Sequence, residues 1–106
     1  MFFGCKEEKA PDYLLSHQKM VPILVDLHIA ERVIDVQDIS YDSSKAYFHD
    51  IFKVKVLAKH QASQADFDSS YTYYLNQPEE FKQIYDRVVD SLSVQQALNR
   101  VELGID

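Results

Sequence analysis

The residues whose spacing could support metal chemistry lie around His28. Glu31 follows His28 by three positions and Asp35 follows Glu31 by four, so the three would share one face of a helix. Bundles that hold two metal ions use Glu-x-x-His pairs on facing helices, but here the order is reversed and no second segment supplies a matching pair. His49 and Asp50 are adjacent and would point in different directions. A solvated polar stripe is therefore favoured over a metal site.

Other residues with catalytic side chains lack the neighbours that catalysis requires. Ser69 and Ser70 have no flanking glycines to form the sharp turn that exposes a nucleophilic serine. Asp66 and Asp68 fit the negatively charged start of a helix better than an acid–base pair. No glycine-rich loop is present in the sequence to bind phosphate. We therefore expect that the protein is not an enzyme and uses no cofactor.

The chain has one cysteine, Cys5, at a sharp change in composition. Two phenylalanines and a glycine precede it, and it is followed by Lys6, Glu7 and Glu8. This arrangement is typical of the cleavage site of a bacterial lipoprotein, in which the cysteine carries acyl chains and becomes the first residue of the mature protein. A secretory signal also needs a basic start and an apolar stretch of roughly 7–15 residues. Because four residues precede Cys5, either that stretch lies upstream of Met1 or Cys5 is an incidental thiol.

Aromatic residues gather in the second half of the chain. Tyr71, Tyr73 and Tyr74 cannot all face inward, since neighbouring residues on a helix differ in direction by about 100°. The simpler interpretation puts Tyr71 and Tyr74 in the core and leaves Tyr73 exposed. Tyrosine is also favoured in protein interfaces, because it combines apolar area with a polar tip. Together with Phe81 and Tyr85, these tyrosines could therefore border a protein-binding groove.

The composition indicates a single all-α domain. A chain of 106 residues is long enough for one modest core. Its two glycines, Gly4 and Gly104, stand near the ends, which argues against the frequent turns of an all-β protein. We expect a small bundle of three to four helices in residues 13–106. Residues 1–12 are expected to be a signal remnant and a flexible, solvated tether.

The charge balance argues against two kinds of partner. The net charge is −6, and the lysines are scattered among acidic residues. Nucleic-acid binding needs clustered basic residues, so we expect none. The acidic surface also disfavours a polybasic membrane contact, and no apolar run approaches the roughly 18 residues of a spanning helix. Membrane contact is therefore expected through lipid at Cys5.

Hydrophobic spacing predicts two helices in the first half of the chain. The first covers residues 16–36, and its regular part should begin near Lys19 because Pro22 is best tolerated in a first turn. The second covers about residues 44–59. Residues 51–56 also alternate like a strand, but with no partner strand elsewhere the helix is preferred.

The two later helices are marked by the residues at their starts. Ser63 is predicted to cap a short third helix that ends near Leu75. Pro78 and the two glutamates after it should begin a fourth helix, which continues through Val101 toward a stop at Gly104. The expected core residues recur at helical spacing: Met20, Ile23, Leu24, Leu27, Ala30, Ile34, Tyr47, Phe48, Ile51, Phe52, Leu57, Phe67, Tyr71, Tyr74, Phe81, Ile84, Tyr85, Val88 and Leu92.

Several segments taken together resemble a known family. They are residues 20–31, 59–60, 67–71, 73–74, 78–81 and 84–88. In this order, over about residues 11–93, they resemble the small helical lipoproteins of Bacteroidetes catalogued as domain of unknown function four-two-nine-six. The resemblance implies a lipidated cysteine shortly before a proline, and Cys5 stands six residues ahead of Pro11.

The resemblance also implies where the protein works. In these bacteria a lysine and two acidic residues after the lipidated cysteine resemble a signal for export to the cell surface, and Lys6, Glu7 and Glu8 fit that pattern. The resemblance thus implies a protein held by lipid at the outer membrane, on its surface or its periplasmic face, that contacts other proteins of the cell envelope. Two alternatives stay open: a soluble ligand- or metal-binding module built on His28, Glu31 and the aromatic helices, and an oligomeric interface.

Overall fold

The computed structural model describes the backbone of residues 10–36 and 43–103, and the side chains of residues 10–32 and 49–98. These residues form four helices and no strand, which confirms the all-α prediction: α1 (His17–Val36), α2 (Ser43–Lys59), α3 (Gln64–Leu75) and α4 (Pro78–Leu103). Cys5, Lys6, Glu7, Glu8 and Gly104 lie outside the described residues.

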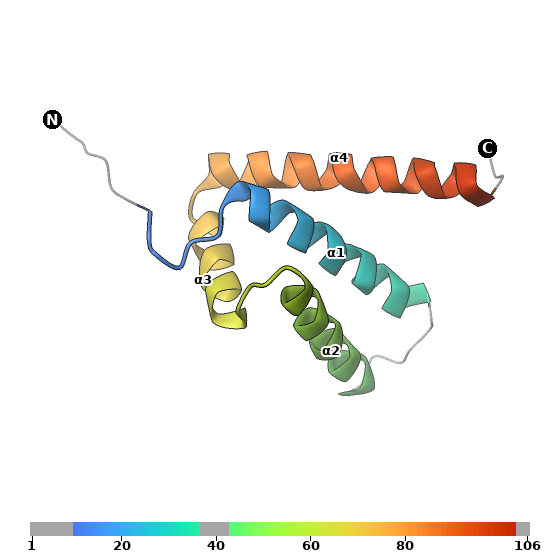
Figure 1. Ribbon diagram of the computed structural model, residues 1–106, viewed down its shortest axis with the longest axis horizontal. Coiled ribbons are helices and arrows are strands. Elements are labelled where there is room, and N and C mark those ends of the chain that lie inside the picture. Colours follow the sequence, from blue (N-terminus) through green and yellow to red (C-terminus); the bar gives the residue numbers. More distant parts are fainter. Residues whose placement is uncertain (1–9, 37–42, 104–106) are drawn as a thin grey trace, which may run out of the picture.

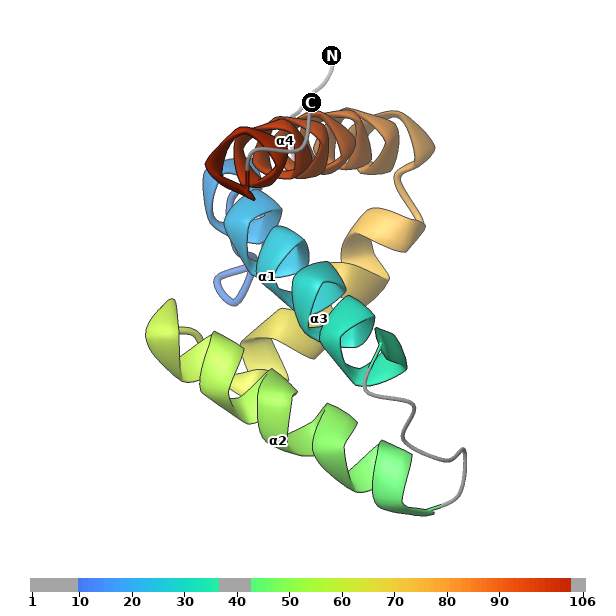
Figure 2. The ribbon, with the colours of Figure 1, turned by 90° about the vertical axis from the view of Figure 1, so that its right-hand side faces the viewer.

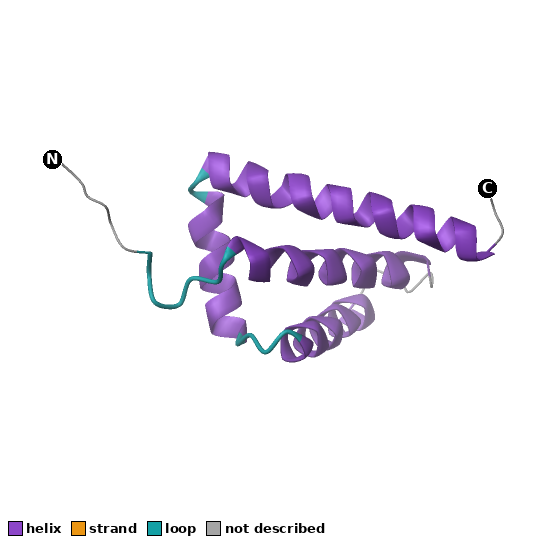
Figure 3. Cartoon of the chain, turned by 45° about the horizontal axis from the view of Figure 1, so that its top comes forward, coloured by secondary structure: helices purple, strands orange, loops and turns teal. Residues whose placement is uncertain are grey.

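The longest helices are stacked side by side, with α1 in the middle. α2 and α4 contact opposite sides of α1, and the short α3 crosses one end of the stack and contacts both of them (Figures 1 and 2). Figure 3 shows α1 and α4 running in nearly the same direction, with α4 continuing past the end of α1.

Helix α1 starts within one residue of the predicted bound, but its regular part begins at His17 rather than Lys19, so Pro22 lies in its second turn. Ser16 caps the helix: its hydroxyl accepts from the backbone N–H of Lys19 at 3.2 Å, and its carbonyl accepts from the N–H of Met20 at 2.8 Å. These bonds satisfy donors that have no partner inside a helix. Because the cap fixes the start at His17, the missing N–H of Pro22 costs one bond within the helix.

The turn from α2 to α3 combines two helix caps. The N–H of Gln61 donates to the carbonyl of Ala58 and the N–H of Ala62 to that of Leu57, both at 3.0 Å, which is the Schellman pattern. Gln61 has φ 57°, a left-handed conformation that glycine adopts more easily. The hydroxyl of Ser63 then accepts from the N–H of Asp66 at 3.0 Å, which confirms the predicted cap of α3. Residues 51–56 lie within α2, as predicted.

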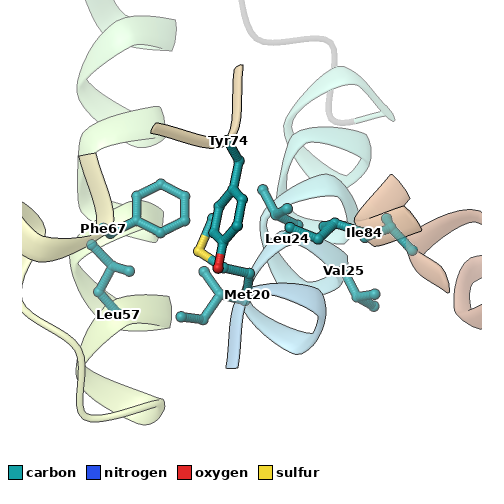
Figure 4. Close-up of a cluster of buried hydrophobic side chains, with 9 residues drawn as sticks. Met20, Leu24, Val25, Leu57, Phe67, Tyr74 and Ile84 are labelled. Carbon is teal, nitrogen blue, oxygen red and sulfur yellow. The ribbon is translucent and has the colours of Figure 1, made fainter. Parts of the chain in front are cut away.

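Among the described side chains, nine form the buried core, and all four helices contribute to it. They are Met20, Ile23, Leu24, Val25, Leu57, Phe67, Tyr74, Ile84 and Val88. Figure 4 shows Met20 and Tyr74 where side chains from the four helices meet. Val25 was not predicted to be buried; it is, because α1 has a helix on either side and so buries more than one stripe. Leu27, Ala30, Ile51 and Phe52 are half-buried, and the side chains of Ile34, Tyr47 and Phe48 lie outside the described residues.

Residues 10–16, which we call the N-terminal strap, are bound to α3. The hydroxyl of Ser70 accepts from the N–H of Leu15 at 2.9 Å and lies 3.4 Å from the carbonyl of Tyr13, to which it donates. The phenol of Tyr74 donates to the carbonyl of Leu15 at 2.7 Å. These bonds fix how the chain enters α1, over a sequence separation of more than fifty residues.

A polar contact joins α1 to the end of α2. Oδ2 of Asp26 accepts from Nε2 of His60 at 2.7 Å and from Nζ of Lys59 at 3.0 Å. Burial by itself raises the pKa of the Asp26 carboxyl, but the hydrogen bonds and positive charges of His60 and Lys59 outweigh it and hold that pKa below 3.8. The contact holds the two helices together at the level of the core.

Candidate functional site

The side chains of all four helices surround a pocket of about 430 Å³, which we call the aromatic pocket. Its apolar wall consists of Leu24, Leu27, Ala30, Phe52, Phe67, Tyr71 and Tyr85. Its polar lining consists of His28, Glu31, His49, Lys53, Asp68 and Thr72. A pocket of this volume, with an apolar wall and a few polar groups, has the size and composition of a ligand-binding or side-chain-binding site.

A row of aromatic rings runs along α3 and α4, and Phe67, Tyr71 and Tyr85 of this row line the pocket. The ring centroids of Phe67 and Tyr71 are 6.1 Å apart, those of Tyr71 and Phe81 are 6.0 Å apart, and those of Phe81 and Tyr85 are 4.8 Å apart. The residues of each helix are three or four positions apart, so they lie on one face. The row places three of the predicted interface residues, Tyr71, Phe81 and Tyr85, side by side.

The polar residues on the α1 side form a chain of hydrogen bonds. Nδ1 of His28 lies 3.3 Å from Oε1 of Glu31, and Nε2 lies 3.3 Å from the phenol oxygen of Tyr85. Burial, and then the hydrogen bond with Tyr71, raise the pKa of Tyr85 well above its usual value. Tyr85 therefore stays protonated at neutral pH, which suits it to donate a hydrogen bond rather than to accept a proton from a substrate.

On the opposite wall, Lys53 of α2 lies between a ring and a carboxylate of α3. Its Nζ donates to Oδ1 of Asp68 at 2.9 Å and lies 5.7 Å from the centroid of the Phe67 ring. This ion pair and cation–π contact link two helices that otherwise touch at few points.

A second hollow, the α1–α4 groove, lies on the other side of His28 and Tyr85. It has a volume of about 650 Å³, and its lining residues are His28, Ile29, Arg32, Tyr85, Val88, Val89, Leu92, Gln95 and Gln96. The His28 and Tyr85 rings, 5.8 Å apart and edge to face, are shared by both hollows. They form the partition between the aromatic pocket and the groove.

The other two predicted interface residues lie elsewhere. Tyr74 is 2% exposed, which confirms its prediction as a core residue, and its phenol binds the strap. Tyr73 is half-buried rather than exposed, because its ring packs edge to face on Tyr74 at 5.4 Å. It borders a third hollow together with Tyr13. The tyrosines of α3 therefore belong to separate surfaces, and Tyr71 alone joins Phe81 and Tyr85 at the aromatic pocket.

The other residues with reactive side chains are spread over the molecule. Ser70 is fully buried and binds the strap, whereas Ser69 is exposed. His28 and Glu31 share a face as predicted, His49 borders the aromatic pocket, and the side chain of Asp35 lies outside the described residues. In the described part of the chain, no three His, Cys, Asp or Glu side chains are grouped so that they could hold a metal ion. None of the described helices is long and apolar enough to cross a membrane.

The sequence reasoning missed Lys53 as a pocket residue and Ser70 as the strap's binding partner. Lys53 and Asp68 are fifteen positions apart in different helices, and no local pattern pairs them. Ser70 did leave a signal, since it follows Phe67 by three positions and precedes Tyr74 by four. A serine at that spacing lies on the buried face of α3 and must have a hydrogen-bond partner.

Comparison with known proteins places the chain in a family. The model of the family described as "Domain of unknown function (DUF4296)" matches residues 11–97, a range that includes the strap, the core and the aromatic pocket. No curated protein and no solved structure matches the chain. On the match over residues 11–97, the chain belongs to the DUF4296 family.

Proposed function

We propose that this protein is a non-enzymatic binding protein of the bacterial cell envelope. In this proposal lipid at Cys5 anchors it to the outer membrane, and its helical domain contacts a protein partner through the aromatic pocket. The observation that carries the proposal is the row of rings from Phe67 to Tyr85 along a pocket open between four helices.

The chemistry of the pocket favours binding over catalysis. Tyrosine and phenylalanine supply large apolar area at a low cost in conformational entropy, and tyrosine adds a polar group. The phenol of Tyr85 is held protonated, and the carboxylate of Asp68 is paired with Lys53. These groups can therefore orient a side chain from a partner by donating and accepting hydrogen bonds.

The anchor is supported by the sequence around Cys5. A single acyl chain binds a membrane only marginally, whereas two or more give stable attachment. A cysteine that carries several chains could therefore hold a domain of net charge −6 at a membrane without basic residues. Lys6, Glu7 and Glu8 supply the pattern that would direct the anchored protein to the cell surface.

The anchor is tested by labelling cells that express the full-length precursor with an alkyne fatty acid. We expect labelling of the parent and none of Cys5→Ala. A variant with Lys6, Glu7 and Glu8 all replaced by Ala should keep the label and lose its sensitivity to protease added to intact cells. Equal labelling of the parent and Cys5→Ala would refute the anchor.

The binding surface is tested by a photo-crosslinking residue at Tyr71. We expect the crosslinker at Tyr71 to join the domain to one discrete protein of the envelope. The matched control is Gln83, which is exposed on α4 and does not border the aromatic pocket. The same adducts from both positions would mean that the pocket is not the contact surface.

A soluble ligand- or metal-binding module is the second candidate. It is favoured by one observation, the position of His28 and Glu31 at the edge of a pocket of about 430 Å³, a volume common among small-molecule sites. Native mass spectrometry and elemental analysis of the purified chain distinguish the two candidates. A stoichiometric metal ion or small molecule, with a lower melting temperature after its removal, would favour this second function.

A further inference from the structure

We propose that the aromatic pocket binds an organic cation, namely the side chain of a lysine or arginine that a protein partner presents. The inference rests on the proposed function, because it specifies the chemistry that the partner brings to this site. Three features of the pocket support it: the position of Lys53, the charged side chains of the lining and the aromatic rings.

An ammonium group of the chain already lies against one wall of the pocket. Nζ of Lys53 is 2.9 Å from Oδ1 of Asp68 and 5.7 Å from the centroid of the Phe67 ring. The Lys53 side chain is 30% exposed. A carboxylate and an aromatic face are the two groups that stabilise an ammonium ion. The wall formed by Phe67 and Asp68 therefore has the chemistry of a cation site.

The fixed charges along the pocket favour a further cation over an anion. Among the described side chains that line the pocket, Glu31 of α1 and Asp68 of α3 are carboxylates, and Lys53 is the one ammonium. The Glu31 side chain is next to His28 but is 49% exposed, so its carboxylate is accessible to an incoming group. The net charge of −6 adds a long-range attraction for basic partners.

The apolar wall suits the stem of a basic side chain. Lysine and arginine carry three or four methylene groups that pack on apolar surfaces while the charged end reaches a polar group. In the pocket the rings of Phe52, Tyr71 and Tyr85 would receive the stem, and Glu31 would receive the charge.

The same charges argue against a lipid headgroup as the source of the cation. A phosphocholine group carries a phosphate next to its ammonium ion. That phosphate would be brought close to Glu31 and Asp68, which repel it. A lysine or arginine side chain brings no such anion, and it fits a pocket whose carboxylates outnumber its ammonium groups.

The experiment is a titration of the ¹⁵N-labelled chain followed by two-dimensional NMR. The probes are n-butylammonium and n-butylguanidinium for the two side chains, 1-butanol as the uncharged analogue, and phosphocholine for the lipid headgroup. We expect the two cations to shift the amide signals of residues 49–53 and 67–72 saturably. Butanol and phosphocholine should bind at least about threefold more weakly, as loss of one partly exposed charge pair implies.

Two substitutions test the assigned roles of the charges. Glu31→Gln should raise the Kd of n-butylammonium about threefold. Lys53→Met removes the internal competitor and frees Asp68, so it should lower that Kd by a similar factor. The side chains of Glu31 and Lys53 are 49% and 30% exposed, so neither change removes a core side chain. The control is Asp86→Asn, which removes an exposed carboxylate paired with Lys82 on α4 and should leave the Kd unchanged.

Three results would overturn the inference. The first is equal binding of butanol and n-butylammonium, which would make the pocket a site for apolar groups of any charge. The second is tighter binding of phosphocholine than of either cation. The third is an unchanged or higher Kd in Lys53→Met. The titration uses the chain without lipid, so its outcome is independent of the labelling at Cys5 and of the crosslinking at Tyr71.

Discussion

At the scale of single residues, the small side chain of Ser70 contributes strongly to the stability of the strap. Its hydroxyl accepts from the N–H of Leu15 and donates to the carbonyl of Tyr13, and it is fully buried. When a buried backbone N–H has no acceptor, the folded state bears the full free-energy cost of removing that N–H from water. Ser70 therefore stabilises the strap chiefly by giving the N–H of Leu15 an acceptor.

We predict that Ser70→Ala lowers the free energy of unfolding by about 1–3 kcal/mol. The measurement is urea denaturation followed by circular dichroism. The matched control is Ser69→Ala, which changes the neighbouring exposed serine and should alter stability by less than about 0.5 kcal/mol. Similar losses in the two variants would mean that the strap bond contributes nothing specific.

At the scale of elements, Asp26 joins α1 to the C-terminal end of α2. Its carboxylate accepts hydrogen bonds from both His60 and Lys59, and its pKa in the folded chain is lowered. A carboxyl whose pKa is lower in the folded than in the unfolded state stabilises the fold above the unfolded pKa. That contribution is lost as the pH falls through the folded pKa.

Asp26→Asn should therefore lower stability at pH 7 by about 1–2 kcal/mol, as expected for the loss of charged hydrogen bonds. The difference from the parent should shrink once the pH falls below 3.8, the ordinary pKa of an aspartate, because the parent carboxyl then becomes protonated. Urea denaturation at pH 7 and at successively lower pH measures it.

The control for this prediction is Asp86→Asn. Asp86 pairs with Lys82 one turn away on the exposed face of α4, and we expect no measurable change in stability at either pH. A difference between parent and Asp26→Asn that stays constant as the pH falls would contradict the assigned role of the Asp26 charge.

The helices themselves could be predicted from the sequence because their signals are local. The cap at Ser63, the proline at Pro78 and the spacing of apolar residues each act within a few positions, and the structure has the helices at those bounds. The regular part of α1 was predicted to begin two residues too late, at Lys19, because the cap at Ser16 outweighs the preference of Pro22 for a first turn.

The aromatic pocket could be predicted only in part. Spacing along α4 put Phe81 and Tyr85 on one face, and Tyr71 was expected near them. Helical spacing along α3 also placed Tyr74 in the core, where it lies. The bond from its phenol to the carbonyl of Leu15 joins segments 59 positions apart, and no local pattern encodes it.

At the scale of the whole molecule, packing is concentrated at the end where α3 crosses the other helices. Ile84 and Val88, near the start of α4, are each 1% exposed, whereas Val94 and Leu98 are 57% and 60% exposed. Beyond Leu92, α4 therefore has few buried apolar contacts among the described side chains. Such segments open locally at a lower free energy than the core.

We predict that amide hydrogen exchange distinguishes the two parts of α4. The amides of residues 94–98 should exchange with opening free energies well below that of global unfolding, while those of residues 84–88 should approach the global value. Native-state exchange at increasing urea measures both. If both groups of amides had the same opening free energy, and it fell equally with urea, α4 would open as one unit.

The strap has a consequence for the order in which the chain folds. Leu15 is synthesised before its hydrogen-bond partners Ser70 and Tyr74, which follow it by 55 and 59 positions. At a synthesis rate of about 5–20 residues per second, those partners arrive roughly 3–12 seconds later. The strap must therefore dock late, once α3 has been made and closes a long loop onto it.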